Sequence, residues 1–247
     1  MLVLPKKKRP PEMVNPKRML LFGQPKTGKT SILASLDDCL IVDLEEGSSH
    51  VSAMAVKVNN LDDYKQLINA LKADMDDNNG KKPYRFIAVD TLTGLEELAL
   101  PFATKLYNQT PMGAKFTGDV RTLPNGAGYL YTRQAFMRLL KPLMNYCDTL
   151  IMVGHVKEKE IGRDGEQMTE RSINLTGQTK NIICGWADTI GLVYRDANKT
   201  MINFAPSDDL IVGSRQEHLI GQKICVASSD ENHKLSIDWT KVFKEEE

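Results

Sequence analysis

The eight residues from Gly23 to Thr30, GQPKTGKT, constrain this chain more than any other stretch. They follow an apolar run, Met19–Phe22, that is typical of a buried strand, and they precede sequence compatible with a helix. The segment matches G-x-x-x-x-G-K-[ST], in which the glycines bring backbone N–H groups close to a triphosphate at a helix N-terminus. Lys29 is expected to reach the β- and γ-phosphates, and the Thr30 hydroxyl to ligate magnesium. The motif therefore predicts a site for Mg2+ and ATP or GTP.

We expect the nucleotide to contact the whole loop and the residue after it. These are Gly23, Gln24, Pro25, Lys26, Thr27, Gly28, Lys29, Thr30 and Ser31.

Two further apolar runs end in acidic residues. Residues 39–47, CLIVDLEEG, place Glu45 and Glu46 just after a second strand, where parallel sheets hold their ligands. The run 84–89, YRFIAV, is followed by Asp90, which we expect to hold the magnesium through water and so to complement Thr30. Either Glu45 or Glu46 can orient and deprotonate the attacking water. The alternatives are that both acids are solvated loop residues or belong to the metal shell.

Length and charge narrow the class of protein. With 247 residues the chain is long enough for one large core. Its 32 basic and 32 acidic residues cancel, so any nucleic-acid contact must come from a local patch. No apolar run is long enough to span a membrane, which predicts a cytoplasmic protein. The cysteines lack C-x-x-C spacing and are expected to be small buried side chains in a reducing compartment.

Strand and helix patterns alternate along most of the sequence. Helical spacing covers 61–75, 95–108, 129–146 and 179–187, and further strands are expected at 149–153 and 188–195, with an antiparallel continuation at 201–204. This predicts an α/β fold with a mostly parallel central sheet between helices and antiparallel strands at its C-terminal end. We place a basic, flexible extension at 1–16, the domain at 17–240 and a charged tail at 241–247. The run 6–9 is a nuclear-import patch, a DNA-contacting arm or a solvated tail.

In this order, GQPKTGKT, IVDLEEG, FIAVDT, IMVGHVKEKE and ADTIGLVYR resemble the RecA-like P-loop ATPases of bacteriophages, a group that includes single-strand annealing and recombination ATPases. The resemblance covers residues 17–225. It implies a RecA-like core, a ring or filament of identical subunits, and action on single-stranded DNA, in the host cytoplasm if the chain is phage-encoded. Enzymes of the helicase and AAA+ type carry Glu directly after the Asp of the third apolar run, whereas Thr91 follows Asp90 here. We therefore expect the base to come from Glu45 or Glu46.

The resemblance also assigns roles outside the nucleotide loop. His155 stands where RecA-like proteins have a polar γ-phosphate sensor, although usually an amide; the alternative is a strand-end histidine with ordinary partners. Arg215 is a candidate to reach a neighbouring subunit's nucleotide, or is simply a surface residue.

Two polar excursions, 109–127 and 156–175, match DNA-lining loops in position. The side chains expected to contact DNA are Lys115, Phe116, Arg121, Lys157, Lys159, Arg163 and Arg171. The second excursion also carries five acids, so a solvated mixed-charge hairpin with a turn at 163–165 is the alternative.

These features predict a Mg-dependent ATPase that acts on single-stranded DNA in recombination, annealing or replication. One alternative function is that of a nucleotide or small-molecule kinase. In such kinases the strand that ends in the metal-binding aspartate usually lies beside the strand that precedes the nucleotide loop, and an arginine-rich lid is present. The other rival is a module that binds ATP without turnover.

Overall fold

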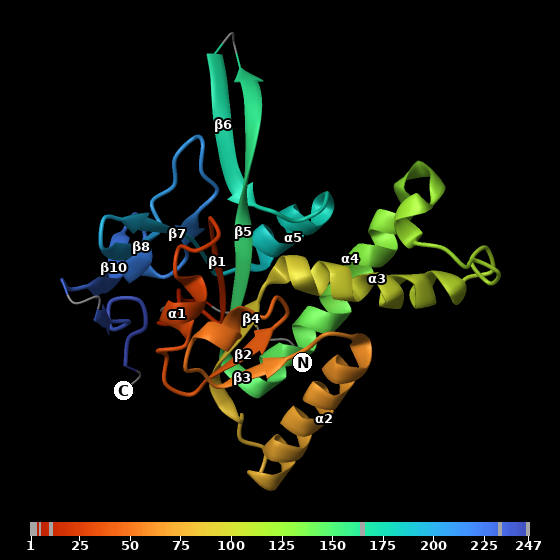
Figure 1. The fold of residues 1–247 in the computed structure, drawn as a ribbon, viewed down its shortest axis with the longest axis horizontal. Helices are drawn as coiled ribbons and strands as arrows, with labels where there is room; N and C mark the ends of the chain where they lie inside the picture. Colours follow the sequence, from red (N-terminus) through yellow and green to blue (C-terminus); the bar gives the residue numbers. More distant parts are fainter. Residues whose placement is uncertain (1–3, 5, 10–11, 164–165, 232–233, 246–247) are drawn as a thin grey trace.

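The computed structural model describes residues 4, 6–9, 12–163, 166–231 and 234–245, with backbone only at 161–163 and 166–168 (Figure 1). One mixed sheet organises the chain in the order β11-β10-β8-β7-β1-β5-β4-β2-β3. The strands that pair in parallel are β1 (Arg18–Gly23), β2 (Cys39–Asp43), β3 (Ala55–Lys57), β4 (Tyr84–Asp90), β5 (Cys147–Arg163) and β7 (Thr189–Asp196). The antiparallel strands are β6 (Glu166–Ile173), β8 (Lys199–Asn203), β9 (Gly213–Ser214), β10 (Lys223–Ser229) and β11 (Leu235–Ile237).

The α-helices are α1 (Lys29–Leu33), α2 (Leu61–Asp77), α3 (Leu92–Asn108), α4 (Ala127–Leu140) and α5 (Gln178–Trp186). Short 3-10 turns occupy Gly47–His50, Val120–Thr122, Pro124–Gly126, Lys141–Tyr146 and Glu217–Leu219. The predicted parallel sheet between helices, with antiparallel C-terminal strands, is confirmed.

Alternation of side chains along β1 divides the core into two layers. Leu20 and Phe22 face one side of the sheet, where they join apolar residues of α2, α3, α4 and α5. Met19 and Leu21 face the other side, where α1 and the end of the chain cover them. Because the central strands are buried on both faces, they read as continuous apolar runs rather than alternating ones.

The end of the chain differs from the expected tail. Val242 and Phe243 are buried in the layer beneath α1, so packed structure extends past residue 240. In the same layer the Trp239 indole N–H donates to the carbonyl oxygen of Ile32 at 3.0 Å. The backbone N–H of Lys244 donates to Asn15 at 2.8 Å, which joins the two ends of the domain.

Strand β5 is longer than predicted. We expected it to end at Gly154 and His155, but it continues to Arg163 and pairs with β6 as a hairpin that projects from the sheet (Figure 1). The predicted hairpin is therefore confirmed, although residues 164 and 165 of its turn lie outside the described residues. The tip between α3 and α4 points in a different direction from this hairpin.

The helix expected at 129–146 is also divided. α4 ends at Leu140 and a 3-10 turn begins at Lys141. Pro142 explains the change, because it lacks the backbone N–H that a continuing α-helix requires.

Candidate functional site

The carboxyl ends of β1, β2 and β4 meet the middle of β5 at one edge of the sheet. The register aligns Asp43 with Asp90, Asp90 with Val153, and Gly23 with His155. A cavity of about 400 Å3 opens there. Its lining includes residues of the nucleotide loop and of the acidic strand ends: Pro25, Lys26, Gly28, Lys29, Thr30, Ser31, Asp43, Glu45, Asp90, Thr91 and His155.

The nucleotide loop has the predicted geometry. Gly28 has φ of 91°, a left-handed conformation that favours glycine. Lys29 is buried, and its ammonium donates to the carbonyl oxygens of Gly23 at 3.1 Å and Gln24 at 2.8 Å. Burial lowers the pKa of Lys29, while the nearby carboxylates of Asp90 and Glu45 oppose that shift. The loop therefore holds a desolvated cation beside the cavity.

Gly23 has a second role that the motif does not indicate. A Cβ atom built on Gly23 would lie 2.2 Å from the carbonyl oxygen of Val193 in β7. Any larger residue must push the loop away from β7, so the glycine here allows close backbone packing.

Thr30 and Asp90, the two residues expected to hold the metal, are in direct contact. The Thr30 hydroxyl donates to Asp90 Oδ2 at 2.6 Å across the cavity. Burial raises the pKa of Asp90, and the Thr30 hydrogen bond and the Lys29 charge counteract part of that shift. A hydroxyl and a carboxylate oxygen so close together are ligands that Mg2+ prefers. The residues present fit magnesium.

The turn after β2 is organised by Asp43, which the sequence analysis did not assign. Its buried carboxylate accepts hydrogen bonds from the backbone N–H groups of Glu45 at 3.1 Å, Gly47 at 3.2 Å and Ser48 at 2.9 Å, and from the Ser48 hydroxyl. These bonds fix the direction in which the chain leaves the sheet. The sequence signal that could have found this residue is an aspartate at the end of an apolar strand.

Of the two candidate glutamates, the structure brings Glu45 to the site. One Glu45 carboxylate oxygen accepts a hydrogen bond from the Thr91 hydroxyl, and the other lies 3.0 Å from His155 Nε2. Glu46 is exposed, has φ of 60°, and does not line the cavity. Only Glu45 is therefore placed to act on a molecule in the cavity.

Thr91 joins Glu45 to the start of α3. It caps α3 by accepting from the Gly94 backbone N–H at 3.3 Å while its hydroxyl donates to Glu45. In this chain Thr91, not a glutamate, follows Asp90. The Glu45 carboxylate, which comes from the turn after β2, lies next to Thr91 instead. The cap also explains why α3 begins at Leu92 rather than at the predicted residue 95.

His155 contacts the candidate base and does not end a strand. Its side chain is about a quarter exposed, and its Nδ1 atom is buried without a hydrogen-bond partner among the described residues. His155 thus has Glu45 as a partner at the site, and its role as a γ-phosphate sensor stays a prediction.

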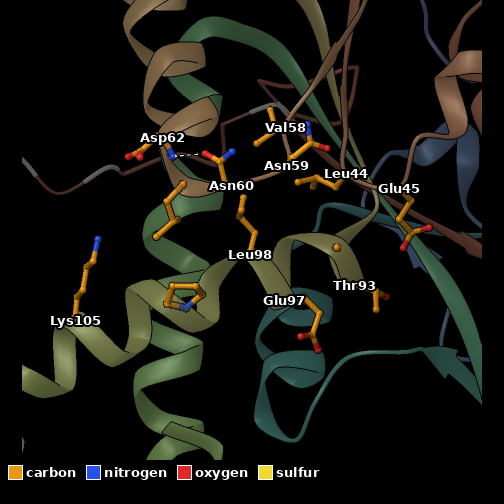
Figure 2. A pocket seen from close by; sticks show the side chains of 13 residues that line it. Leu44, Glu45, Val58, Asn59, Asn60, Asp62, Thr93, Glu97, Leu98 and Lys105 are labelled. Atoms are coloured by element: carbon orange, nitrogen blue, oxygen red, sulfur yellow. Dashed lines mark hydrogen bonds between the residues drawn. The ribbon is translucent and has the colours of Figure 1, made fainter. Parts of the chain in front are cut away.

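Glu45 also borders a second cavity, of about 740 Å3 (Figure 2). Its walls come from the end of β2, the start of α2 and most of the length of α3, with Glu45, Asp62, Glu97 and Lys105 as charged residues. Asn60 caps α2 there by accepting from the Asp62 backbone N–H at 2.9 Å. The Glu45 side chain therefore stands between two cavities.

The residues expected to contact DNA are spread over two separate regions. Near the α3–α4 tip, the Phe116 ring packs edge-on against Tyr107 at 5.3 Å, and Arg121 pairs with Asp119 and Glu97. Lys115 is exposed beside them. Phe116 is therefore packed on its own chain rather than presented as an open stacking face.

The second region is the β5/β6 hairpin, in which the lysines and the glutamates of β5 lie on opposite faces. Lys157 and Lys159 lie on one face of the ribbon, and Glu158 and Glu160 on the other, because successive residues point to opposite faces. Arg171 pairs with Asp209 at 2.7 Å. The side chain of Arg163 lies outside the described residues.

Arg215 lies at the opposite edge of the sheet from the cavity. Its guanidinium is 3.5 Å from Asp188, at the start of β7, and Arg18 at the start of β1 contacts the same carboxylate at 2.5 Å. The structure does not bring Arg215 to the nucleotide loop of its own chain.

The loop, the Thr30–Asp90 pair and the parallel sheet define a P-loop NTPase. The chain belongs to the AAA domain family, whose model matches residues 15–216. Membership of this family implies binding and hydrolysis of ATP, typically with Mg2+. No curated protein matches the chain. Within the described residues, no helix has both the length and the hydropathy needed to cross a bilayer.

Proposed function

We propose that this protein is a Mg-dependent ATPase with a RecA-like core that acts on single-stranded DNA. Glu45 is the general base in this proposal. The observation that carries the catalytic part is the position of its carboxylate, held between Thr91 and His155 at the cavity that Lys29, Thr30 and Asp90 also line.

The side chains divide the chemistry among them. Lys29 neutralises phosphate charge, Thr30 and Asp90 hold the metal, and Glu45 orients a water molecule and takes its proton. A magnesium ion held by Thr30 and Asp90 would supply positive charge that offsets the charge developing on the phosphate oxygens. Thr91 and His155 fix the Glu45 carboxylate, so that the base is positioned before the reaction begins.

His155 also links the site to the β5/β6 hairpin. It lies in β5 just before the part of the strand that leaves the sheet. A movement of the Glu45 side chain would therefore be passed through His155 to the first residues of the hairpin. The face that carries Lys157 and Lys159 is the candidate surface for DNA phosphates. A RecA-like ring or filament and a phage recombination role belong to the same proposal, on the motif resemblance.

The strand order disfavours the kinase alternative. β5 separates the strand of the nucleotide loop, β1, from the Asp90 strand, β4, whereas kinases of that kind usually pair them directly. The arginines of the two excursions also do not cluster: Arg121 pairs with Asp119 near the α3–α4 tip, and Arg171 pairs with Asp209 at the hairpin.

The test of turnover compares Glu45→Gln with Glu46→Gln. We expect Glu45→Gln to lower kcat by at least about 100-fold while ATP binding persists, because general-base catalysis contributes about 100- to 10,000-fold. Glu46→Gln is the matched control and should keep wild-type turnover. Unchanged hydrolysis in Glu45→Gln removes this mechanism, and ATP binding without any wild-type turnover supports the binding-module alternative.

The DNA part needs its own test. ATPase rates are measured with and without single-stranded DNA at low and moderate salt, for the wild type, a Lys157→Ala/Lys159→Ala variant and a Lys72→Ala control on α2. Stimulation that fades with salt and is lost only in the hairpin variant supports DNA on this face. A real ATPase that DNA does not stimulate rejects the DNA partner and leaves the catalytic assignment intact.

A further inference from the structure

An exposed arginine lies at the same sheet edge as the nucleotide loop, on the side away from Glu45. Leu192 of β7 pairs in parallel with Phe22 of β1, and Arg195 follows three residues later. Parallel strands carry both residues toward the carboxyl edge, where the loop after β1 begins. Arg195 is thus at the nucleotide edge, unlike Arg215.

The side chain of Arg195 is held next to the loop. Its Nη1 atom donates to the hydroxyl oxygen of Thr200 at 2.7 Å, and Thr200 is 1 % exposed in β8. The same hydroxyl oxygen would lie 3.6 Å from a Cβ atom built on Gly28. Thr200 therefore stands between the guanidinium and the nucleotide loop.

Within the part of the chain that the structure describes, no carboxylate forms an ion pair with this arginine. None of the ion pairs found among the described residues includes Arg195, whereas Arg18, Arg121, Arg171 and Arg215 each have an acidic partner. A positioned, exposed guanidinium without an acidic partner suits an anionic ligand, and its planar fork matches phosphate oxygens.

The sheet order gives the direction of the nucleotide. The groups that act on the γ-phosphate, Asp90 and Glu45, belong to β4 and β2, which lie on the β5 side of β1. The other end of the triphosphate must then leave toward β7 and β8, on the opposite side of β1. Arg195 and Thr200 lie on these two strands, and Thr200 stands beside Gly28 of the loop.

We propose that Arg195 binds the α-phosphate of the nucleotide and that Thr200 positions it. This inference rests on the proposed ATPase function and adds a residue to the same site. Arg195 contacts a phosphate that does not change during hydrolysis, so it contributes equally to ground-state and transition-state binding. Its loss raises KM and leaves kcat unchanged.

The experiment measures ADP binding by calorimetry, together with kcat and KM for ATP. Arg195→Ala is expected to weaken ADP binding by about 10-fold and to raise KM for ATP similarly, the loss of one charge-assisted hydrogen bond. Thr200→Val should give a smaller loss in the same direction. Lys199→Ala removes an exposed charge of the same β-hairpin and should behave as the wild type.

The results separate this inference from the function it rests on. Wild-type ADP affinity in Arg195→Ala, with binding abolished in Lys29→Ala, rejects the role of Arg195 alone. A wild type that binds no ADP overturns the proposed function and this inference with it. Inorganic tripolyphosphate serves as a competitor: if Arg195→Ala weakens ADP but not tripolyphosphate, the contact is with the nucleoside and the α-phosphate assignment is wrong.

Discussion

Asp43 should hold in place the turn after β2 that carries Glu45, so Asp43→Asn is expected to lower both the stability of the protein and its rate of ATP turnover. The carboxylate accepts four hydrogen bonds, from the backbone N–H groups of Glu45, Gly47 and Ser48 and from the Ser48 hydroxyl. An asparagine offers only one acceptor oxygen, so about two of these bonds are lost. At about 1.5 kcal/mol for each bond to a charged group, the variant should lose about 3 kcal/mol of unfolding free energy. This is a large share of the stability of a typical domain.

Turnover should fall for a separate reason. The Glu45 backbone N–H is one of the donors, so loosening the turn displaces the candidate base. A displacement of about 1 Å in a reacting group can cost about 100-fold in rate. We therefore expect kcat to drop by that order while ADP binding, which depends on the loop after β1, changes little.

The pH dependence of stability provides an independent check. Burial alone would raise the pKa of Asp43, but the hydrogen bonds from Ser48, Glu45 and Gly47 lower it further, to below its usual value. A depressed pKa contributes stability above the unfolded-state value of about 3.9, and this contribution is lost as the pH falls through the folded-state pKa. The difference between wild type and Asp43→Asn should be constant from about pH 8 to pH 5 and narrow below about pH 4.

Urea unfolding at several pH values and steady-state ATPase assays measure these effects. Asp37→Asn, which changes an exposed carboxylate before β2, is the matched control and should leave both unchanged. Ser48→Ala should cost about 1.5 kcal/mol, since it removes one of the four bonds to the carboxylate. The same urea midpoint and kcat in Asp43→Asn as in the wild type, or a stability difference that persists unchanged at pH 3, would refute the reasoning.

Three further predictions concern the packing around the site. Gly23→Ala should lower the urea midpoint and weaken ADP binding together, because its Cβ would lie 2.2 Å from a carbonyl oxygen of β7; either effect without the other contradicts this. Asp188→Ala should cost about 3 kcal/mol in a urea titration, since it leaves Arg18 without its nearly buried partner; a cost below about 1 kcal/mol contradicts this. Burial raises the pKa values of Cys39 and Cys147 to about 12, so both thiols should resist alkylation at pH 8 until urea unfolds the protein.

Much of the fold could be predicted because the parallel strands carry strong local signals. Buried strands such as Tyr84–Asp90 are continuous apolar runs, and the nucleotide loop has fixed residue types at fixed spacing. The short strands β3, β9 and β11 were not predicted. They are two or three residues long and depend on pairing with a neighbour rather than on any pattern of their own.

The candidate site divides in a similar way. Lys29, Thr30 and Asp90 follow from the sequence, because each is fixed by the loop motif or by the end of an apolar strand. The choice of Glu45 over Glu46 does not, because it depends on hydrogen bonds to residues 46 and 110 positions away in the chain. The side chains of adjacent residues in a turn point in different directions. The tertiary contacts of the turn therefore decide which of the two glutamates faces the cavity.

The sequence by itself therefore determined the class of site, since phosphate binding needs a local loop whose geometry its own residues dictate. Tertiary structure alone decided how the charges are distributed around that site. It placed Arg195 at the nucleotide edge and Arg215 at the opposite edge, and it packed Phe116 against Tyr107. The physical reason is that the position of a side chain at a sheet edge depends on strand order and register, which are set by contacts between segments distant in sequence.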